Sequence, residues 1–155
     1  MDGNRQNAMV RAAEDVIDYS FIDKELPWEA LQAAGLNMAF CYPEGNKRLA
    51  MIGNAVVKLV VLEDLRVADS PRDAGDMQNT LSYIGSNANL NRVGRLNNLE
   101  AIVNRNPSQP GAVAANTLTA TFEALIGAVY LDSGGTTTCA RLVMEKLGLW
   151  PNWSS

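Results

Sequence analysis

Apolar residues recur at helical spacing along almost the whole chain. No stretch of useful length alternates apolar and polar residues, which argues against β-strands. We therefore predict an all-α fold. The predicted helices cover 4–19, 27–35, 44–67, 77–85, 87–96, 114–131 and 136–147.

Residues typical of turns and helix ends mark several of these boundaries. Ser86 has the side chain of a helix N-cap, and 69–75 is rich in turn formers. The stretch 104–111 contains prolines and is the one long loop that the pattern predicts. The helix over 44–67 carries the widest apolar stripe, so we expect it to be the central element of the fold.

The size of the chain fits one domain. With 155 residues, 47% of them hydrophobic, it can bury a core without disulfides or metals. We predict a single domain over 1–155, with its core at about 4–148 and a C-terminal tail at 149–155. The longest apolar run, 55–62, is too short to span a bilayer, and the N-terminus lacks the pattern of a targeting peptide. We therefore expect an intracellular, cytoplasmic protein without membrane contact.

The charges and the missing residue types narrow the chemistry. The 13 Lys and Arg residues against 17 Asp and Glu residues give a net charge of −4. This balance counts against nucleic acid as the default partner, because phosphate neutralisation supplies most of such affinity. The absence of His excludes His-based acid–base catalysis, Ser-His triads and His-ligated zinc. Cys41 and Cys139 lie far apart in the sequence and indicate free thiols in a reducing compartment.

Two of the predicted helices contain an internal glycine. Gly53 lies within 46–56, and Gly127 lies within 120–132. A glycine inside a helix costs about 1 kcal/mol relative to alanine. We interpret both glycines as points of close helix approach, either within the chain or from a second subunit.

The same two segments resemble the motifs of the ribonuclease III catalytic domain. The family's first motif, roughly N-E-R-L-E-F-L-G-D-A, is similar to N-K-R-L-A-M-I-G-N-A at 46–55. Its second motif, D-x-F-E-A-L-I-G-A-x-Y-L-D, matches 120–132 at every fixed position except the first. Residues 19–31 and 86–94 resemble two further segments of the family. The resemblance covers nearly the whole chain and implies the all-α ribonuclease III fold, assembled as a homodimer.

The resemblance also implies a magnesium site that this chain has largely lost. The family cuts double-stranded RNA with Mg²⁺ held by four carboxylates, and the corresponding residues here are Ala50, Asn54, Ala120 and Glu123. Only Glu123 keeps a carboxylate, and Lys47 replaces a further acid of the first motif. Because Mg²⁺ needs several anionic oxygens, we expect no metal cofactor. Glu123 remains the one candidate catalytic residue.

Helical spacing suggests a partner for Glu123. Positions 47, 50 and 54 share one face of the first motif helix. We therefore hypothesise that the Lys47 ammonium takes the place of the missing cation and forms an ion pair with Glu123.

The resemblance assigns a dimer interface to the same helix. The family places an aromatic residue that enters the partner subunit at the position of Met51. We therefore predict that Met51, Ile52 and Gly53 lie at the interface, and a methionine in the chain's own core is the alternative.

Three functions remain open at this point. The first, which we favour, is a non-catalytic homodimer in RNA processing that binds double-stranded RNA or acts as a protein scaffold. The chain is acidic, and no double-stranded-RNA-binding domain is expected after the last helix. The second is a weak metal-dependent endonuclease that uses Glu123 with Glu44 or Asn54 as substitute ligands. The third is a recruited fold whose former metal cavity, beside Lys47, binds or transforms a small molecule.

Overall fold

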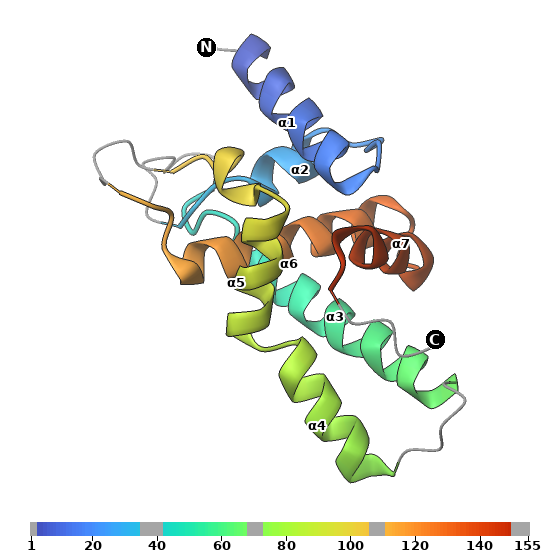
Figure 1. The fold of residues 1–155 in the computed structure, drawn as a ribbon. Helices are drawn as coiled ribbons and strands as arrows, with labels where there is room; N and C mark the ends of the chain where they lie inside the picture. Colours follow the sequence, from blue (N-terminus) through green and yellow to red (C-terminus); the bar gives the residue numbers. More distant parts are fainter. Residues whose placement is uncertain (1–2, 35–41, 68–72, 106–110, 150–155) are drawn as a thin grey trace.

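The computed structural model describes residues 3–34, 42–67, 73–105 and 111–149, and this part of the chain is helical (Figure 1). Its only β-structure is an isolated bridge between Gln32 and Asn104. No helix in this part is long and apolar enough to cross a membrane. The all-α prediction is confirmed. The elements are α1 (Gly3–Ile17), α2 (Glu25–Ala30), α3 (Lys47–Val67), α4 (Ala74–Ile84), α5 (Asn87–Leu96), the 3₁₀ turn η1 (Leu99–Ala101), α6 (Ala115–Asp132) and α7 (Thr137–Leu147).

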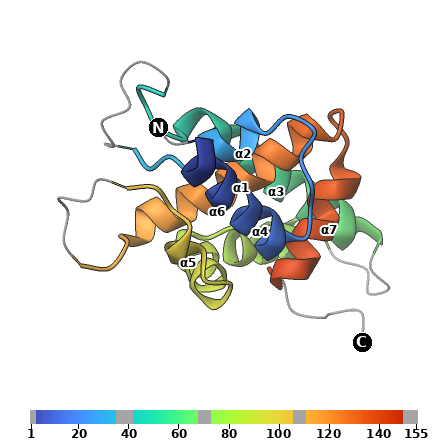
Figure 2. The same cartoon turned by 90° about the horizontal axis from the view of Figure 1, so that it is seen from above.

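The central helix of the fold is α6. It packs most extensively against α3 and also contacts α2, α5 and α7, and Figures 1 and 2 show these helices around it. Nearly every residue from Leu118 to Val129 is buried, as expected for a helix that is apolar on all sides. The prediction that the 44–67 helix is central needs correction, because α3 keeps an exposed side that includes Met51 and Leu59.

Local backbone geometry explains where the helix boundaries differ from the prediction. The first helix ends at Ile17 instead of residue 19, because Asp18 adopts a left-handed conformation with φ 55°. The helix predicted from residue 44 begins at Lys47, after a series of turns. The predicted cap at Ser86 is confirmed, since its side chain accepts a hydrogen bond from the Asn89 N–H at 3.1 Å.

Some predicted features lie partly outside the described residues. These are Cys41, most of the turn at 69–75, most of the loop at 104–111 and the tail from residue 150. Leu149, predicted to begin the tail, is fully buried. Its N–H donates to the Met144 carbonyl at 3.1 Å, and its own carbonyl accepts from Asn89 Nδ2 at 3.2 Å. The packed core therefore extends to Leu149.

Two glycines bring the backbones of α3 and α6 into contact. A Cβ atom at Gly53 would overlap the carbonyl oxygen of Glu123, and a Cβ atom at Gly127 would overlap that of Leu49. The close approach predicted for both glycines is confirmed, and both contacts lie within one chain. This crossing fixes the position of Glu123 relative to α3.

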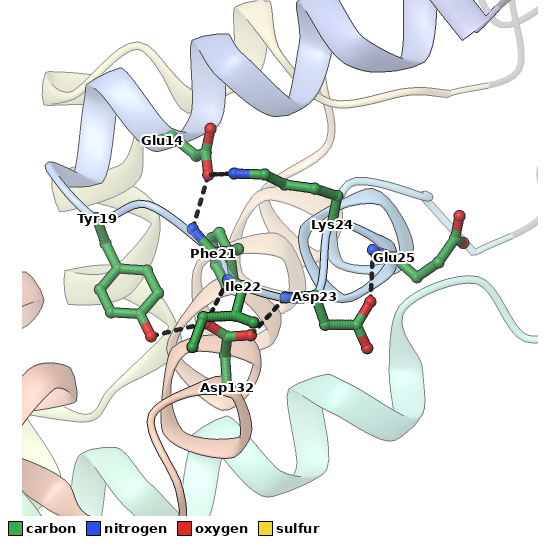
Figure 3. Close-up of polar contacts among 8 residues, drawn as sticks. All are labelled: Glu14, Tyr19, Phe21, Ile22, Asp23, Lys24, Glu25 and Asp132. Carbon is green, nitrogen blue, oxygen red and sulfur yellow. Dashed lines mark hydrogen bonds and ion pairs between the residues drawn. The ribbon is translucent and has the colours of Figure 1, made fainter.

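Asp132, at the end of α6, holds the segment between α1 and α2 (Figure 3). Its carboxylate accepts hydrogen bonds from the Tyr19 hydroxyl at 2.8 Å and from the N–H groups of Ile22 and Asp23, each at 2.9 Å. Three donors on one carboxylate tie together segments that are far apart in the sequence. Asp132 is the last residue of the second motif, and its role here is structural.

These contacts shift two pKa values in opposite directions. Partial burial acts to raise the pKa of Asp132, but the hydrogen bonds from Asp23, Ile22 and Tyr19 and the charge of Lys24 outweigh it and hold the pKa below its ordinary value. The pKa of Tyr19 is raised, first by burial and then by its hydrogen bond to Asp132. Both groups therefore keep their neutral-pH protonation states.

We expect Gly53→Ala to lower the free energy of unfolding by about 3 kcal/mol or more, because the added methyl group would force α3 away from the α6 backbone. Chemical denaturation measures this change. Gly3→Ala is the matched control, since a Cβ at Gly3 meets no atom within 4 Å. Its expected effect is within about 1 kcal/mol, and equal effects of the two substitutions would contradict the close crossing.

We expect Asp132→Asn to lower the free energy of unfolding by about 1–2 kcal/mol near neutral pH. Because the folded-state pKa of Asp132 is lowered, the stabilising contribution is present above the unfolded pKa and is lost as the pH falls through the folded value. The difference between wild type and variant should therefore narrow as the pH falls. Denaturation curves across acidic pH measure it, with Asp15→Asn on the exposed side of α1 as control. A difference independent of pH would contradict this assignment.

Candidate functional site

A cavity of about 430 Å³ lies between α3 and α6 and brings most of the predicted site positions together. Its described lining consists of Lys47, Ala50, Met51 and Asn54 from α3 and Glu123 from α6. Ala120, the remaining family position, lies three residues before Glu123 on α6 and is not part of this lining. The residues grouped by sequence resemblance are thus largely neighbours in space.

Glu123 is the buried acid of this cavity. Only 9% of the residue is exposed, and its Oε2 accepts a hydrogen bond from Asn54 Nδ2 at 2.7 Å. Burial raises the pKa of Glu123, while the Asn54 hydrogen bond and the charge of Lys58 act to lower it without cancelling the rise. An amide from α3 therefore satisfies the one carboxylate of the site.

The hypothesis that Lys47 pairs with Glu123 is wrong. No ion pair joins these two residues in the described part of the chain, although both line the cavity. The cation that acts on Glu123 is Lys58, four residues after Asn54 on the same helix. Sequence reasoning missed Lys58, although its spacing from Asn54 places it on the face of α3 that the site uses.

Asn46 holds the start of α3 against two other helices. Its buried side chain donates to the Ala30 carbonyl at 2.9 Å and to Thr121 Oγ1 at 3.2 Å. Thr121 in turn donates to the Thr117 carbonyl at 2.9 Å. Sequence comparison marked Asn46 as the first residue of the motif, but only the three-dimensional contacts show this positioning role.

The residues of the cavity do not fit a pair of magnesium ions. Ala50 and Ala120 offer no side-chain ligand, and the Asn54 amide group donates to Glu123. Across the described residues there is no group of three or more Asp, Glu, His or Cys side chains that could hold a metal. One carboxylate cannot neutralise two divalent ions, and the nearby Lys47 adds charge of the wrong sign.

Glu44 does not supply the missing carboxylate. It lines a separate cavity of about 290 Å³ together with Glu29 and Arg48. In that cavity burial raises the pKa of Glu29, and the charge of Arg48 partly opposes the rise. The structure therefore does not support Glu44 as a substitute metal ligand beside Glu123.

The three predicted interface residues have different surroundings. Met51 is 75% exposed and Ile52 is half-buried, whereas Gly53 is buried against the Glu123 carbonyl of the same chain. Gly53 therefore lies at the crossing of α3 and α6, where it packs against its own chain. Met51 and Ile52 are the members of this set whose side chains reach the surface.

The sequence model of a family described as ribonuclease-III-like matches residues 23–148, which include both motif helices and the cavity. The chain belongs to this family. The ribonuclease-III-like assignment agrees with the motifs at 46–55 and 120–132, so the resemblance found in the sequence is confirmed.

Curated relatives carry the name Ribonuclease 3. The protein from Aliarcobacter butzleri is 30% identical over 124 residues, which cover 78% of this chain and 54% of the relative. The protein from Rickettsia rickettsii is 32% identical over 139 residues, which cover 86% of this chain and 60% of the relative. The chain thus spans little more than half the length of these relatives.

Solved structures of a nuclease domain share the fold. One structure of the nuclease domain of Ribonuclease III from Campylobacter jejuni superposes with a TM-score of 0.79 at 22% identity and covers 90% of this chain and 96% of its own. Another gives a TM-score of 0.73 at 21% identity, with 96% and 95% covered. At this identity the likeness establishes the ribonuclease-III-like fold of this chain.

We expect Asn54 and Glu123 to be energetically coupled. A double-mutant cycle with Asn54→Ala and Glu123→Ala should give a coupling free energy of about 1 kcal/mol or more, because the hydrogen bond joins a buried carboxyl group to its donor. Chemical denaturation of the four proteins measures it. The same cycle on Gln78 and Ser82, an exposed pair 3.2 Å apart on α4, should give less than about 0.5 kcal/mol. Equal coupling in both cycles would contradict a special role for the buried pair.

Proposed function

We propose that this protein is an intracellular, non-catalytic homodimer of the ribonuclease III fold that binds double-stranded RNA. The observation that carries the proposal is the hydrogen bond from the Asn54 side-chain amide to Glu123. Glu123 is the one acid of the cavity's described lining, and its carboxylate accepts from an amide. The family fold and the cavity between α3 and α6 remain, whereas the charge that would hold two metal ions does not. Binding without cutting is the function that this combination supports best.

The electrostatics of the cavity oppose hydrolysis by the metal mechanism. A pair of divalent ions carries four positive charges and needs several anionic oxygens nearby. Of the described lining, Glu123 is the one acid and Lys47 is a cation, so a metal ion would meet little net attraction. The alternative of a weak endonuclease rests on Glu123 alone, because Glu44 lines another cavity.

A small-molecule role is the other candidate that an observation supports. The cavity of about 430 Å³ lies within the range of about 300–1,000 Å³ that is usual for ligand sites. Its lining combines apolar Ala50 and Met51 with polar Asn54 and Glu123. In this reading the former metal site would bind or transform an organic ligand.

The exposed side of α3 supports the proposed homodimer. Met51, Ala55 and Leu59 follow each other at four-residue spacing, so they share one face of the helix, and all three are exposed. An apolar row on an outward helix face is typical of a surface covered by another subunit. The related nuclease domain from Campylobacter jejuni is described with a region involved in dimer formation. A mass near twice 16.8 kDa by light scattering would support the same assembly here.

We expect the wild-type protein to bind long duplex RNA and to leave it intact in Mg²⁺ or Mn²⁺. Gel-shift and cleavage assays on one preparation measure the two properties. Cleavage that disappears in Glu123→Ala would overturn the non-catalytic proposal and support the weak endonuclease. Intact RNA without a salt-dependent shift would instead favour a protein or small-molecule partner.

A variant with restored acids is the matched control for this assay. Lys47→Glu, Ala50→Glu, Asn54→Asp and Ala120→Asp together return carboxylates to the family positions and leave Gly53 and Gly127 in place at the α3–α6 crossing. We expect calorimetry to show Mn²⁺ binding by this variant and none by wild type. Equal Mn²⁺ binding by the two proteins would show that the wild-type site has not lost its metal.

A further inference from the structure

Helix α4 has an exposed side that includes an aromatic residue. The helix lies at the edge of the molecule (Figure 1) and packs mainly against α3 and α5. Its buried residues are Leu81 and Ile84, whereas Tyr83, beside Ile84, is 63% exposed. Because aromatic side chains are enriched at interfaces, the Tyr83 ring is a suitable anchor for another segment.

The segment around Tyr83 carries no charged side chain. Residues 77–91, which form most of α4 and the start of α5, contain no Asp, Glu, Lys or Arg, although 19% of the whole chain is charged. A nucleic acid or a charged peptide would find no counter-charge within this segment. A neutral, aromatic partner fits it better, because interface cores are poor in charge and rich in aromatic residues.

The last described residues of the chain lead to this side of α4. The side chain of Asn97, just after α5, donates to the Leu147 carbonyl at 2.9 Å. The side chain of Asn89, in the first turn of α5, donates to the Leu149 carbonyl at 3.2 Å, so the chain runs from the end of α5 toward its start. Asn89 Nδ2 also donates to the Ile84 carbonyl at 2.8 Å. Leu149 therefore lies beside the last residue of α4.

The sequence that follows Leu149 is aromatic and uncharged. It reads Trp-Pro-Asn-Trp at 150–153, outside the described residues. A Trp side chain carries a large apolar area and packs favourably against another aromatic ring. Four residues span at most about 14 Å, so Trp153 remains within the length of α4, about 16 Å for its 11 residues.

Other exposed apolar side chains are less suited to this segment. Leu96, 73% exposed, lies at the end of α5 that the chain leaves behind. Ile22 donates through its N–H to Asp132, which lies about 20 Å along α6 from Thr119, where α6 contacts the start of α5. The exposed row on α3 that begins at Met51 belongs to the face that the proposed homodimer covers.

We propose that the exposed side of α4 around Tyr83 is the docking surface for the chain's own segment 150–153, whose Trp rings cover the Tyr83 ring. The segment is covalently attached beside its docking surface. Its docking therefore avoids most of the loss of translational freedom that opposes association of separate molecules. The inference is independent of RNA binding, since it uses neither the cavity between α3 and α6 nor its lysine.

The test is fluorine NMR of the full chain labelled with 5-fluorotryptophan, which gives one signal for each of its three Trp residues. Trp150→Phe and Trp153→Phe identify the two signals of the segment. We expect at least one of these signals to lie away from its position in the denatured protein. Tyr83→Ala should move it toward that position, because the ring contact is lost, and the signal of the core residue Trp28 should stay unchanged.

Two further substitutions are the controls. Leu142 is 60% exposed on α7 and lines a cavity with Ile17 of α1, so Leu142→Ala should leave the segment signals unchanged. Tyr83→Phe keeps the aromatic ring and should retain the wild-type signals. Segment signals at their denatured positions in wild type would overturn the docking. Equal effects of Tyr83→Ala and Leu142→Ala, or loss of the shift in a folded Tyr83→Phe protein, would overturn the contact with Tyr83.

Dilution distinguishes docking on the same chain from docking on a second copy. We expect the shifted signals to be independent of protein concentration, because a contact within one chain does not follow mass action. Signals that return to their denatured positions on dilution, while the Trp28 signal stays unchanged, would overturn docking within the chain in favour of a second copy.

Discussion

The contact between the backbones of α3 and α6 determines the rest of the structure. Gly53 and Gly127 have no side chains, so each helix reaches the carbonyl groups of the other, at Glu123 and Leu49. Close approach at this point surrounds α6 with apolar neighbours and brings the Asn54 amide to 2.7 Å from the Glu123 carboxylate. The cavity beside the crossing is therefore a consequence of main-chain packing. Of the family-site residues, Ala50 belongs to the buried core and Ala120 packs against it.

The same crossing can carry different chemistry because its geometry does not depend on the acids of the family. Fold and function separate at such a site, since the scaffold persists while the groups that perform the reaction change. Here a buried carboxyl group has an amide donor at Asn54 and a lysine at the cavity edge. An anion fits the charge of Lys47 better than a metal ion does, and the surface of α3 around Met51 is apolar enough for contact with a second subunit.

Local sequence rules predicted the helical pattern and the cap at Ser86, because each depends on residues near one another in the chain. The cost of a glycine inside a helix predicted a close approach at Gly53, but not that its neighbour would be Glu123 on α6. They did not identify which apolar helix is surrounded on all sides, since periodicity describes one helix without its neighbours. The motifs located the site around Glu123, and helical spacing correctly placed Lys47 on its face. Spacing does not give the reach of a side chain across a helix junction, so the Asn54 amide was missed as the partner of Glu123.

The amide–carboxyl contact also changes how the fold relates to its ionic surroundings. A cluster of four acids at a helix junction holds mutual repulsion that a bound cation must offset. In this chain the described lining of the junction contains one acid, Glu123, whose carboxylate accepts a hydrogen bond from the neutral Asn54 amide. The packing of α3 against α6 therefore needs no cation to offset repulsion between carboxylates in the described lining of this junction.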